Sequence, residues 1–562
     1  MAKAGYTNNL IFTPNNILLK PMSKIFNRQL CRAVVSGILL ALPWYETLPS
    51  YSVFFGFVPL LIAYDELNEK GSRFWKLMLY VFIAFFTWSA LSTWWIYRAT
   101  VLGAILAVFI TTLLMTIVFA GYHFIRRYAG KVTGIFGFIT LWIAYERFFH
   151  NSEIAWPWLS LGNSLGNHPK VIQWYEFTGM MGGSLWILVV NFLILGLVYA
   201  LKSKQFRRAG WFSMAALLTF ILPLWVSISM YNRYSEVQNP VRVVIVQPSI
   251  DPYNEKFSGL TNEQQLDIML NLAKQATDST TDYVVCPETA IDDRIWEHEL
   301  RVNPSILRIK QFVDSLPNVK WVTGAITLKL FNSSVNLPPT ARELPYREGY
   351  FYDRYNSAIQ VDTAFQLPIY HKSKLVVGVE MMPYPKQLKF LEKLAIDLGG
   401  ISGSLGTQPD RGVLWSPDGR FGVGPIICYE SDFGEFVSGY IKNGANLLFV
   451  ITNDGWWGNT PGYKQHLSFS RIRAIEMRRS VARSANTGVS AIINQRGDLV
   501  RTLGWWERGT ISGTINANNR LTWYVSEGDY IGRMSAFLAV LTLAVALAAY
   551  LMKGRGRSAK RS

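Results

Sequence analysis

Long apolar runs fill the first 231 residues of the chain and then stop. They cover roughly residues 33–44, 51–64, 77–97, 101–125, 132–149, 174–201 and 210–230. Most approach the roughly 20 residues that an α-helix needs to cross a bilayer, whereas the first two are shorter and favour tilted helices or a hairpin. One more run, 532–552, stands alone near the C-terminus. The pattern predicts an α-helical transmembrane bundle of about eight spans.

Residues 232–531 show a different pattern, in which short β-branched runs alternate with polar helical segments. Strands are predicted at 241–247, 283–286, 321–326, 357–361, 422–428, 447–452 and 489–494. One helix is predicted over 261–276, where Thr261 and Gln264 have the spacing of a capping box, and another over the arginine-rich stretch 466–483. This region is therefore predicted to be an α/β domain.

The composition agrees with a chain that is partly in lipid. Of the 562 residues, 50% are hydrophobic and only 17% are charged, which argues against a disordered chain and against an ordinary soluble enzyme. The three cysteines are too few for a disulfide framework. The net charge of +17 suits either a nucleic-acid-binding protein or a membrane protein with basic cytoplasmic loops.

The positions of the basic residues favour the membrane protein. With the N-terminus inside, the inner segments hold 20 Lys and Arg residues, and the short outer loops hold only Arg98 and Lys170. The predicted organisation is a cytoplasmic tail, a membrane domain of about seven spans, an extracytoplasmic catalytic domain, a last transmembrane helix and a basic cytoplasmic tail. Their bounds are 1–30, 31–231, 232–531, 532–552 and 553–562. Both termini are then cytoplasmic, and no nucleic-acid partner is expected.

Three predicted strands end in residues that can carry chemistry. VVCPET (284–289) delivers Glu288, YHKSKLVVGVE (370–380) contains Lys372 and Glu380, and GVGPIICYES (422–431) contains Cys428. Taken singly, each motif also suits a bland interpretation: a solvated loop glutamate, a surface charge cluster or a small buried thiol. Together they supply a nucleophile, a base that takes its proton and a cation that lowers the thiol pKa or stabilises an oxyanion.

Other kinds of site find little support in the sequence. There is no nucleotide-binding GxxxxGK[ST] loop, no HExxH and no paired CxxC, and the six histidines lack metal-ligand spacing. We therefore expect neither a metal nor a cofactor. Cys286 lies inside an apolar strand and is interpreted as structural.

The order strand-PET, lysine motif, strand-CYE resembles the nitrilase, or carbon–nitrogen hydrolase, superfamily and its Glu–Lys–Cys triad. Such a domain between seven apolar spans and a last one resembles the bacterial apolipoprotein N-acyltransferase family. Further matching stretches are VRVVIVQPSIDPYNEKF (241–257), NDGWWG (453–458) and RIRAIEMRRSVARSANTG (471–488). The resemblance implies that residues 232–531 form a nitrilase-like αββα sandwich.

By this resemblance, Glu288 is the general base, Lys372 the oxyanion stabiliser and Cys428 the nucleophile. The matching supporting residues are Glu380, Tyr429 and Glu430, and Phe257 and Trp456 match the acyl site. The sequence departs from the family in two places. The usual LVPFGE is LVVGVE (375–380) here, which puts the role of Glu380 in doubt, and Phe257 stands where a tryptophan is common.

The implied reaction is N-acylation of a lipoprotein at the bacterial inner membrane. A glycerophospholipid donates an acyl chain to Cys428, and the N-terminal diacylglyceryl-cysteine of an apolipoprotein accepts it. Segment 381–407 suits an amphipathic lid or a packed surface helix. Two alternatives remain open: a membrane-tethered amidase or nitrilase with the same triad, and a non-catalytic membrane scaffold or receptor.

Overall fold

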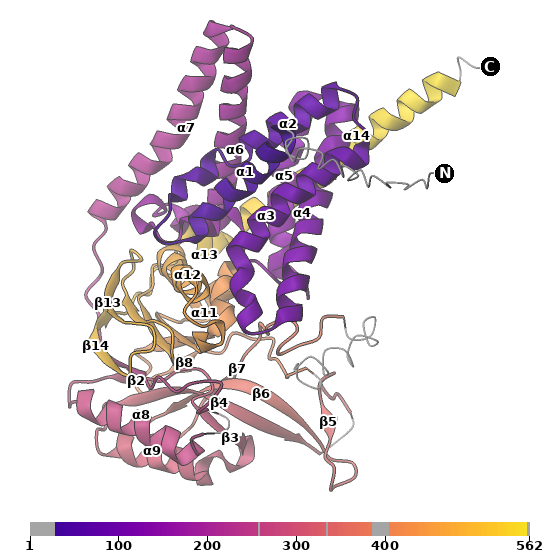
Figure 1. Cartoon of the computed structure of the whole chain (residues 1–562). Helices are drawn as coiled ribbons and strands as arrows, with labels where there is room; N and C mark the ends of the chain where they lie inside the picture. Colours follow the sequence, from indigo (N-terminus) through magenta and orange to yellow (C-terminus); the bar gives the residue numbers. More distant parts are fainter. Residues whose placement is uncertain (1–27, 257–258, 333–334, 385–403, 559–562) are drawn as a thin grey trace, which may run out of the picture.

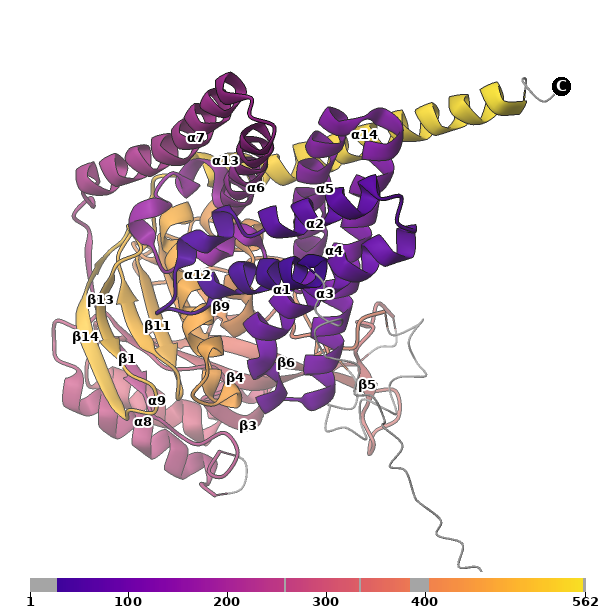
Figure 2. The same cartoon turned by 45° about the horizontal axis from the view of Figure 1, so that its top comes forward.

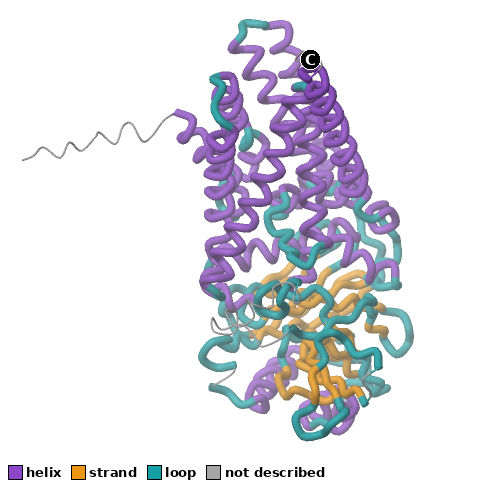
Figure 3. Tube along the Cα trace, turned by 90° about the vertical axis from the view of Figure 1, so that its right-hand side faces the viewer, coloured by secondary structure: helices purple, strands orange, loops and turns teal. Residues whose placement is uncertain are grey.

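The computed structural model describes residues 28–256, 259–332, 335–384 and 404–558. Helices gather at one end of the molecule and strands at the other, with the chain passing from the first zone to the second after α7 and returning at α14 (Figures 1 and 3). The helical zone contains α1 (Arg28–Ala41), α2 (Val58–Glu69), α3 (Phe74–Thr93), α4 (Val101–Ala129), α5 (Lys131–Asn151), α6 (Tyr175–Lys202), α7 (Phe206–Arg233) and α14 (Tyr530–Ser558).

Six helices in the described part of the chain are long and apolar enough to cross a membrane. They are Phe74–Arg98, Val101–Ala129, Lys131–Asn151, Tyr175–Lys202, Phe206–Arg233 and Tyr530–Lys553. The first two predicted spans are instead the short helices α1 and α2, of 14 and 12 residues, joined through the 3-10 turns Leu42–Trp44 and Ser50–Phe54. α1 packs against both α2 and α3. The predicted helical membrane bundle is therefore confirmed, with two short helices at its start.

The α/β domain is built on two sheets. The first has the strand order β14-β1-β2-β4-β6-β5, with β3 beside β4 and β7 beside β6. Its strands are β1 (Pro240–Gln247), β2 (Tyr283–Val285), β3 (Ile291–Trp296), β4 (Lys320–Phe331), β5 (Arg342–Glu343), β6 (Phe351–Val361), β7 (Ile369–His371) and β14 (Gly509–Asn516). β1, β2 and β4 run parallel and are almost fully buried, as their continuous β-branched sequences predict.

The second sheet has the order β13-β12-β11-β10-β9-β8. Its strands are β8 (Leu414–Trp415), β9 (Gly422–Ile427), β10 (Leu447–Thr452), β11 (Val481–Ala485), β12 (Ser490–Ile493) and β13 (Leu499–Leu503). The two sheets pack face to face. The ring of Tyr283 on the first sheet lies edge-on to that of Phe449 on the second, with 5.1 Å between the ring centroids.

Helices cover both outer faces of this pair of sheets (Figures 1 and 2). α8 (Asn262–Ala276) and α9 (Pro304–Asp314) lie on the face away from the membrane helices, whereas α11 (Gly434–Lys442), α12 (Pro461–Met477) and α13 (Trp523–Glu527) lie between the second sheet and the helical zone. The predicted αββα sandwich is confirmed, and so is the capping box of Thr261 and Gln264 at the start of α8.

The prediction of one helix over 466–483 is wrong in its second half. α12 ends at Met477, Arg478 adopts a left-handed conformation with φ of 48°, and Arg483 belongs to strand β11. The side chain of Arg478 bonds Glu176 at 2.5 Å and Gln173 at 2.7 Å. Buried polar contacts with distant segments therefore override the helical preference of the arginine-rich sequence.

Candidate active site

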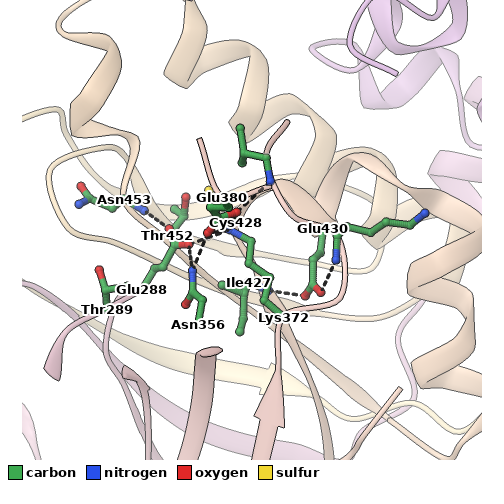
Figure 4. Close-up of polar contacts among 12 residues, drawn as sticks. Glu288, Thr289, Asn356, Lys372, Glu380, Ile427, Cys428, Glu430, Thr452 and Asn453 are labelled. Carbon is green, nitrogen blue, oxygen red and sulfur yellow. Dashed lines mark hydrogen bonds and ion pairs between the residues drawn. The ribbon is translucent and has the colours of Figure 1, made fainter. Parts of the chain in front are cut away.

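Lys372 lies at the centre of a group of buried polar side chains (Figure 4). It follows β7, and its backbone N–H donates to the carbonyl of Asn356 on β6 at 2.8 Å. Its Nζ lies 3.0 Å from Oε1 of Glu288 and 2.9 Å from Oε2 of Glu380. The lysine is thus enclosed by two carboxylates and is only 1% exposed.

Glu288 reaches the lysine from the turn after β2. Asn356 Nδ2 donates to Glu288 Oε1 at 2.8 Å, and the backbone N–H of Asn453 donates to Oε2 at 3.2 Å. Gly324 on the neighbouring strand β4 allows this close approach, since a Cβ there would lie 2.7 Å from the Cα of Glu288. Both oxygens of the carboxylate are therefore held in place by neighbours.

Glu380 joins the same group despite the altered LVVGVE sequence. Asn356 Nδ2 donates to its Oε1 at 3.0 Å, and the backbone N–H of Val376 donates to its Oε2 at 2.9 Å. Gly378 within this loop has φ of 81°, a conformation that glycine adopts without strain. The displaced glycine thus still allows a turn that returns Glu380 to Lys372.

Cys428 approaches the charged group from the second sheet. It follows β9 directly, and its φ of 50° makes a sharp turn from the strand into the 3-10 helix Cys428–Asp432. Its carbonyl oxygen accepts hydrogen bonds from Ser431 Oγ at 2.9 Å and from His466 Nε2 at 3.2 Å. A non-glycine residue with a positive φ of this kind costs about 1–3 kcal/mol of conformational energy and is kept where its surroundings hold the backbone in place.

The electrostatics of these three residues set their protonation states at rest. Burial alone would raise the pKa of Glu288, but Lys372 and Asn356 hold this pKa below its usual range. Burial raises the pKa of the Cys428 thiol well above its usual range, the charge of Glu288 raises it further, and Lys372 opposes both. Burial would lower the pKa of Lys372, but the two carboxylates raise it well above its usual range. The resting site holds a thiol, a carboxylate and an ammonium group.

The two residues after Cys428 fix its surroundings. Glu430 accepts from the backbone N–H of Ile427 at 2.9 Å and of Ser373 at 2.7 Å, so its carboxylate joins the nucleophile strand to the lysine loop. Tyr429 points the other way, toward the membrane domain, where its hydroxyl donates to the carbonyl of Ala155 at 2.7 Å.

The predicted acyl-site residues are placed only in part. Trp456 is half-buried in the 3-10 turn Asp454–Trp457, with its ring 5.3 Å from that of Tyr253. Phe257 and residues 385–403 of the predicted lid lie outside the described residues. Cys286 is fully buried in an apolar cluster beside Val284 and Ile359, and burial raises its pKa well above the usual range.

Sequence reasoning missed two residues that complete the site. Asn356 bridges both carboxylates from the middle of β6, and His466 supports the Cys428 carbonyl from α12. A polar side chain directly before the apolar run SAIQV was the available signal for Asn356, whereas His466 had none. Within the described ranges, no group of three or more His, Cys, Asp or Glu side chains could hold a metal ion.

Comparison with known proteins agrees with this arrangement. The family model described as carbon-nitrogen hydrolase matches residues 242–523, and that described as apolipoprotein N-acyltransferase N-terminal domain matches residues 36–193. An apolipoprotein N-acyltransferase of Chlorobaculum tepidum is 29% identical over 94% of this chain and 98% of its own length. Another, of Geobacter metallireducens, is 24% identical over 89% and 92%, respectively.

Among solved structures, an amidase from Nesterenkonia sp. is similar at 16% identity and a TM-score of 0.35, over 53% of this chain and 97% of the amidase. The carbon-nitrogen hydrolase match spans half of the 562 residues and contains the Glu288, Lys372 and Cys428 positions. The chain belongs to the carbon-nitrogen hydrolase family.

Proposed function

We propose that this protein is an apolipoprotein N-acyltransferase, which moves an acyl chain from a glycerophospholipid to the N-terminal amine of a diacylated lipoprotein. The observation that carries the proposal is the combination of a carbon-nitrogen hydrolase domain with a matching N-acyltransferase N-terminal domain in one chain. The names of the two curated relatives, which align over about nine-tenths of the chain or more, support it. The six long apolar helices in the described part of the chain suit substrates that stay in the bilayer.

In the first half-reaction, Cys428 becomes acylated. Glu288 takes the thiol proton as Sγ attacks the ester carbonyl of the phospholipid, and the oxyanion that forms is stabilised by the Lys372 ammonium. Collapse of this intermediate breaks the ester C–O bond. The proton held by Glu288 passes to the departing alkoxide, so lysophospholipid leaves and a thioester remains.

In the second half-reaction, the α-amino group of the lipoprotein attacks the thioester. Glu288 accepts a proton from the attacking nitrogen, and Lys372 again stabilises the oxyanion. The C–S bond breaks, the Cys428 thiolate recovers the proton, and the amide product leaves. The protonation states of the resting site suit this cycle, because a carboxylate, an ammonium group and a thiol are all present before substrate arrives.

We further propose that the catalytic domain, residues 232–531, lies on the periplasmic side of the inner membrane with both termini in the cytoplasm. The excess of basic residues in the inner loops supports this orientation. A reporter that is active only outside the cytoplasm should work when fused within 232–531 and fail when fused after Lys553. Activity at both places would refute the orientation.

The function is tested by supplying the two substrates in sequence. The purified protein is incubated with phospholipid, freed of excess lipid, and then given a diacylated lipopeptide with a free N-terminal amine. The proposal predicts a lipopeptide whose mass grows by one acyl chain, attached at nitrogen. Release of free fatty acid without a change in the lipopeptide would indicate a membrane-tethered hydrolase, and no acyl transfer at all would indicate a scaffold.

A further inference from the structure

A single glutamine of the catalytic domain is fully hydrogen-bonded by the membrane domain. Gln465 on α12 is 3% exposed, and its Nε2 donates to the carbonyls of Trp44 at 2.9 Å and Ser92 at 3.1 Å. Its Oε1 accepts from the indole nitrogens of Trp158 at 2.6 Å and Trp95 at 3.1 Å. One side chain thus ties α12 to three separate segments of the membrane domain.

The next residue along α12 holds the nucleophile turn. His466 is fully buried, and its Nε2 lies 3.2 Å from the carbonyl oxygen of Cys428 and 2.9 Å from Ser431 Oγ. Its Nδ1 lies 2.8 Å from Oδ1 of Asp454, whose other oxygen lies 2.7 Å from Nη2 of Arg483. The buried ion pair of Asp454 and Arg483 therefore holds the imidazole ring in place.

Helix geometry explains why the adjacent residues Gln465 and His466 can face different parts of the molecule. Successive side chains of an α-helix are about 100° apart around the axis, so Gln465 can point to the membrane domain while His466 points to the second sheet. Gly462, one turn earlier, gives α12 room to approach Trp95, since a Cβ there would lie 2.6 Å from the indole ring. The Trp158 ring lies beside His466 as well, at 6.0 Å.

We propose that Gln465 and His466 are positioning residues that couple the docking of the catalytic domain on the membrane domain to the placement of Cys428. Gln465 holds α12 against the membrane domain, and His466, the next residue on α12, holds the backbone turn at Cys428. The membrane domain thereby helps to position the Cys428 thiol, in addition to binding lipid. For its kinetic test the proposal rests on the proposed acyl transfer.

The test compares Gln465→Leu, His466→Asn and the double variant in the full-length protein. We expect each single variant to form the acyl-enzyme about 10- to 100-fold more slowly at saturating phospholipid, because small displacements of a nucleophile cost that much. The apparent KM for phospholipid should change little. The double variant should lose no more than the worse single variant, because both residues act through one path.

Gln360→Leu is the matched control. Gln360 is equally buried, and its Nε2 donates to Asp362 at 3.0 Å and to the carbonyl of Trp415 at 2.8 Å, entirely within the catalytic domain. It should keep the wild-type acylation rate within about twofold. If Gln465→Leu acylates as fast as Gln360→Leu, or if the losses of Gln465→Leu and His466→Asn multiply, the coupling is refuted.

Alkylation of Cys428 by iodoacetamide separates this proposal from the proposed function, because it needs no lipid. Slower alkylation in Gln465→Leu than in Gln360→Leu supports the coupling even if phospholipid proves not to be the acyl donor, and equal rates contradict it. Should Gln465→Leu fail to fold, Trp158→Phe removes the 2.6 Å indole hydrogen bond and keeps an aromatic ring at the same place. This variant should slow both reactions in the same direction, and an unchanged rate would refute the coupling.

Discussion

The two halves of the site are held in place by different physical means. On the first sheet, Lys372, Glu288, Glu380 and Asn356 position one another through charge and charge-assisted hydrogen bonds. On the second sheet, Cys428 is placed by a strained backbone turn and by hydrogen bonds from buried neighbours to its carbonyl oxygen. The lysine half is complete within the α/β domain, whereas the nucleophile half continues into the membrane domain through Tyr429 and Gln465.

This difference separates what each half contributes. In the charged half, the carboxylates and the ammonium group set one another's protonation states through contacts within the α/β domain. The half that contains Cys428 is connected to the membrane domain through Tyr429 and Gln465. Substitutions in the first half should therefore act mainly on electrostatics, and substitutions in the second mainly on geometry.

The largest effect should follow the loss of the central cation. Lys372→Met removes the cation that contacts both Glu288 and Glu380 and leaves the two buried carboxylates side by side, which should reduce the rate of acyl-enzyme formation by on the order of 1,000-fold. Removing one partner of such a buried pair also costs about 3–5 kcal/mol of stability. Single-turnover kinetics and urea unfolding measure the two effects. Acylation at the wild-type rate would exclude Lys372 from the chemistry.

A smaller effect is expected at the altered loop. Glu380→Gln keeps the shape of the side chain but removes one of the two carboxylates at Lys372, so acylation should slow by on the order of 100-fold in a normally folded protein. Glu236→Gln is the control, because Glu236 accepts from Gln495 N and Asn516 Nδ2 and has no contact with Lys372. Equal rates in the two variants would remove Glu380 from the catalytic group while leaving the triad intact.

The smallest effect should be that of pH on the acylation step. The pKa of Glu288 is lowered and that of the Cys428 thiol is raised, so a carboxylate and a neutral thiol coexist from about pH 5 to about pH 8. The rate of acyl-enzyme formation with phospholipid alone should be nearly constant over this range and fall only as Glu288 becomes protonated at lower pH. A tenfold rise per pH unit between 6 and 8 would instead indicate attack by a thiolate formed in bulk solvent.

The sequence pointed to the residues at the strand ends but not to the distant side chains that hold them. Glu288, Lys372 and Cys428 each follow a β-rich run, so their meeting at strand ends could be expected from local patterns. The contacts of Gln465 and His466 could not, because they join α12 to residues that are distant in the sequence. The same long-range contacts explain why the helix predicted through Arg483 ends at Met477.

In the membrane domain, the apolar runs predicted where helices lie but not how the first two are used. Runs 33–44 and 51–64 are shorter than a span, and length alone does not decide between a buried helix and a re-entrant segment. In the structure, α1 and α2 are short helices joined through 3-10 turns; α1 packs against α3, and α2 is largely buried against its neighbours.

The most direct test of the account is the mass of the intact protein after incubation with phospholipid and no amine. The account predicts an increase of one acyl chain, which hydroxylamine removes, in the wild type and in Cys286→Ser, and no increase in Cys428→Ser. The adduct must appear before any lipopeptide is added. An adduct that persists in Cys428→Ser, or one that maps to Cys286, would contradict the assignment of Cys428 as the nucleophile.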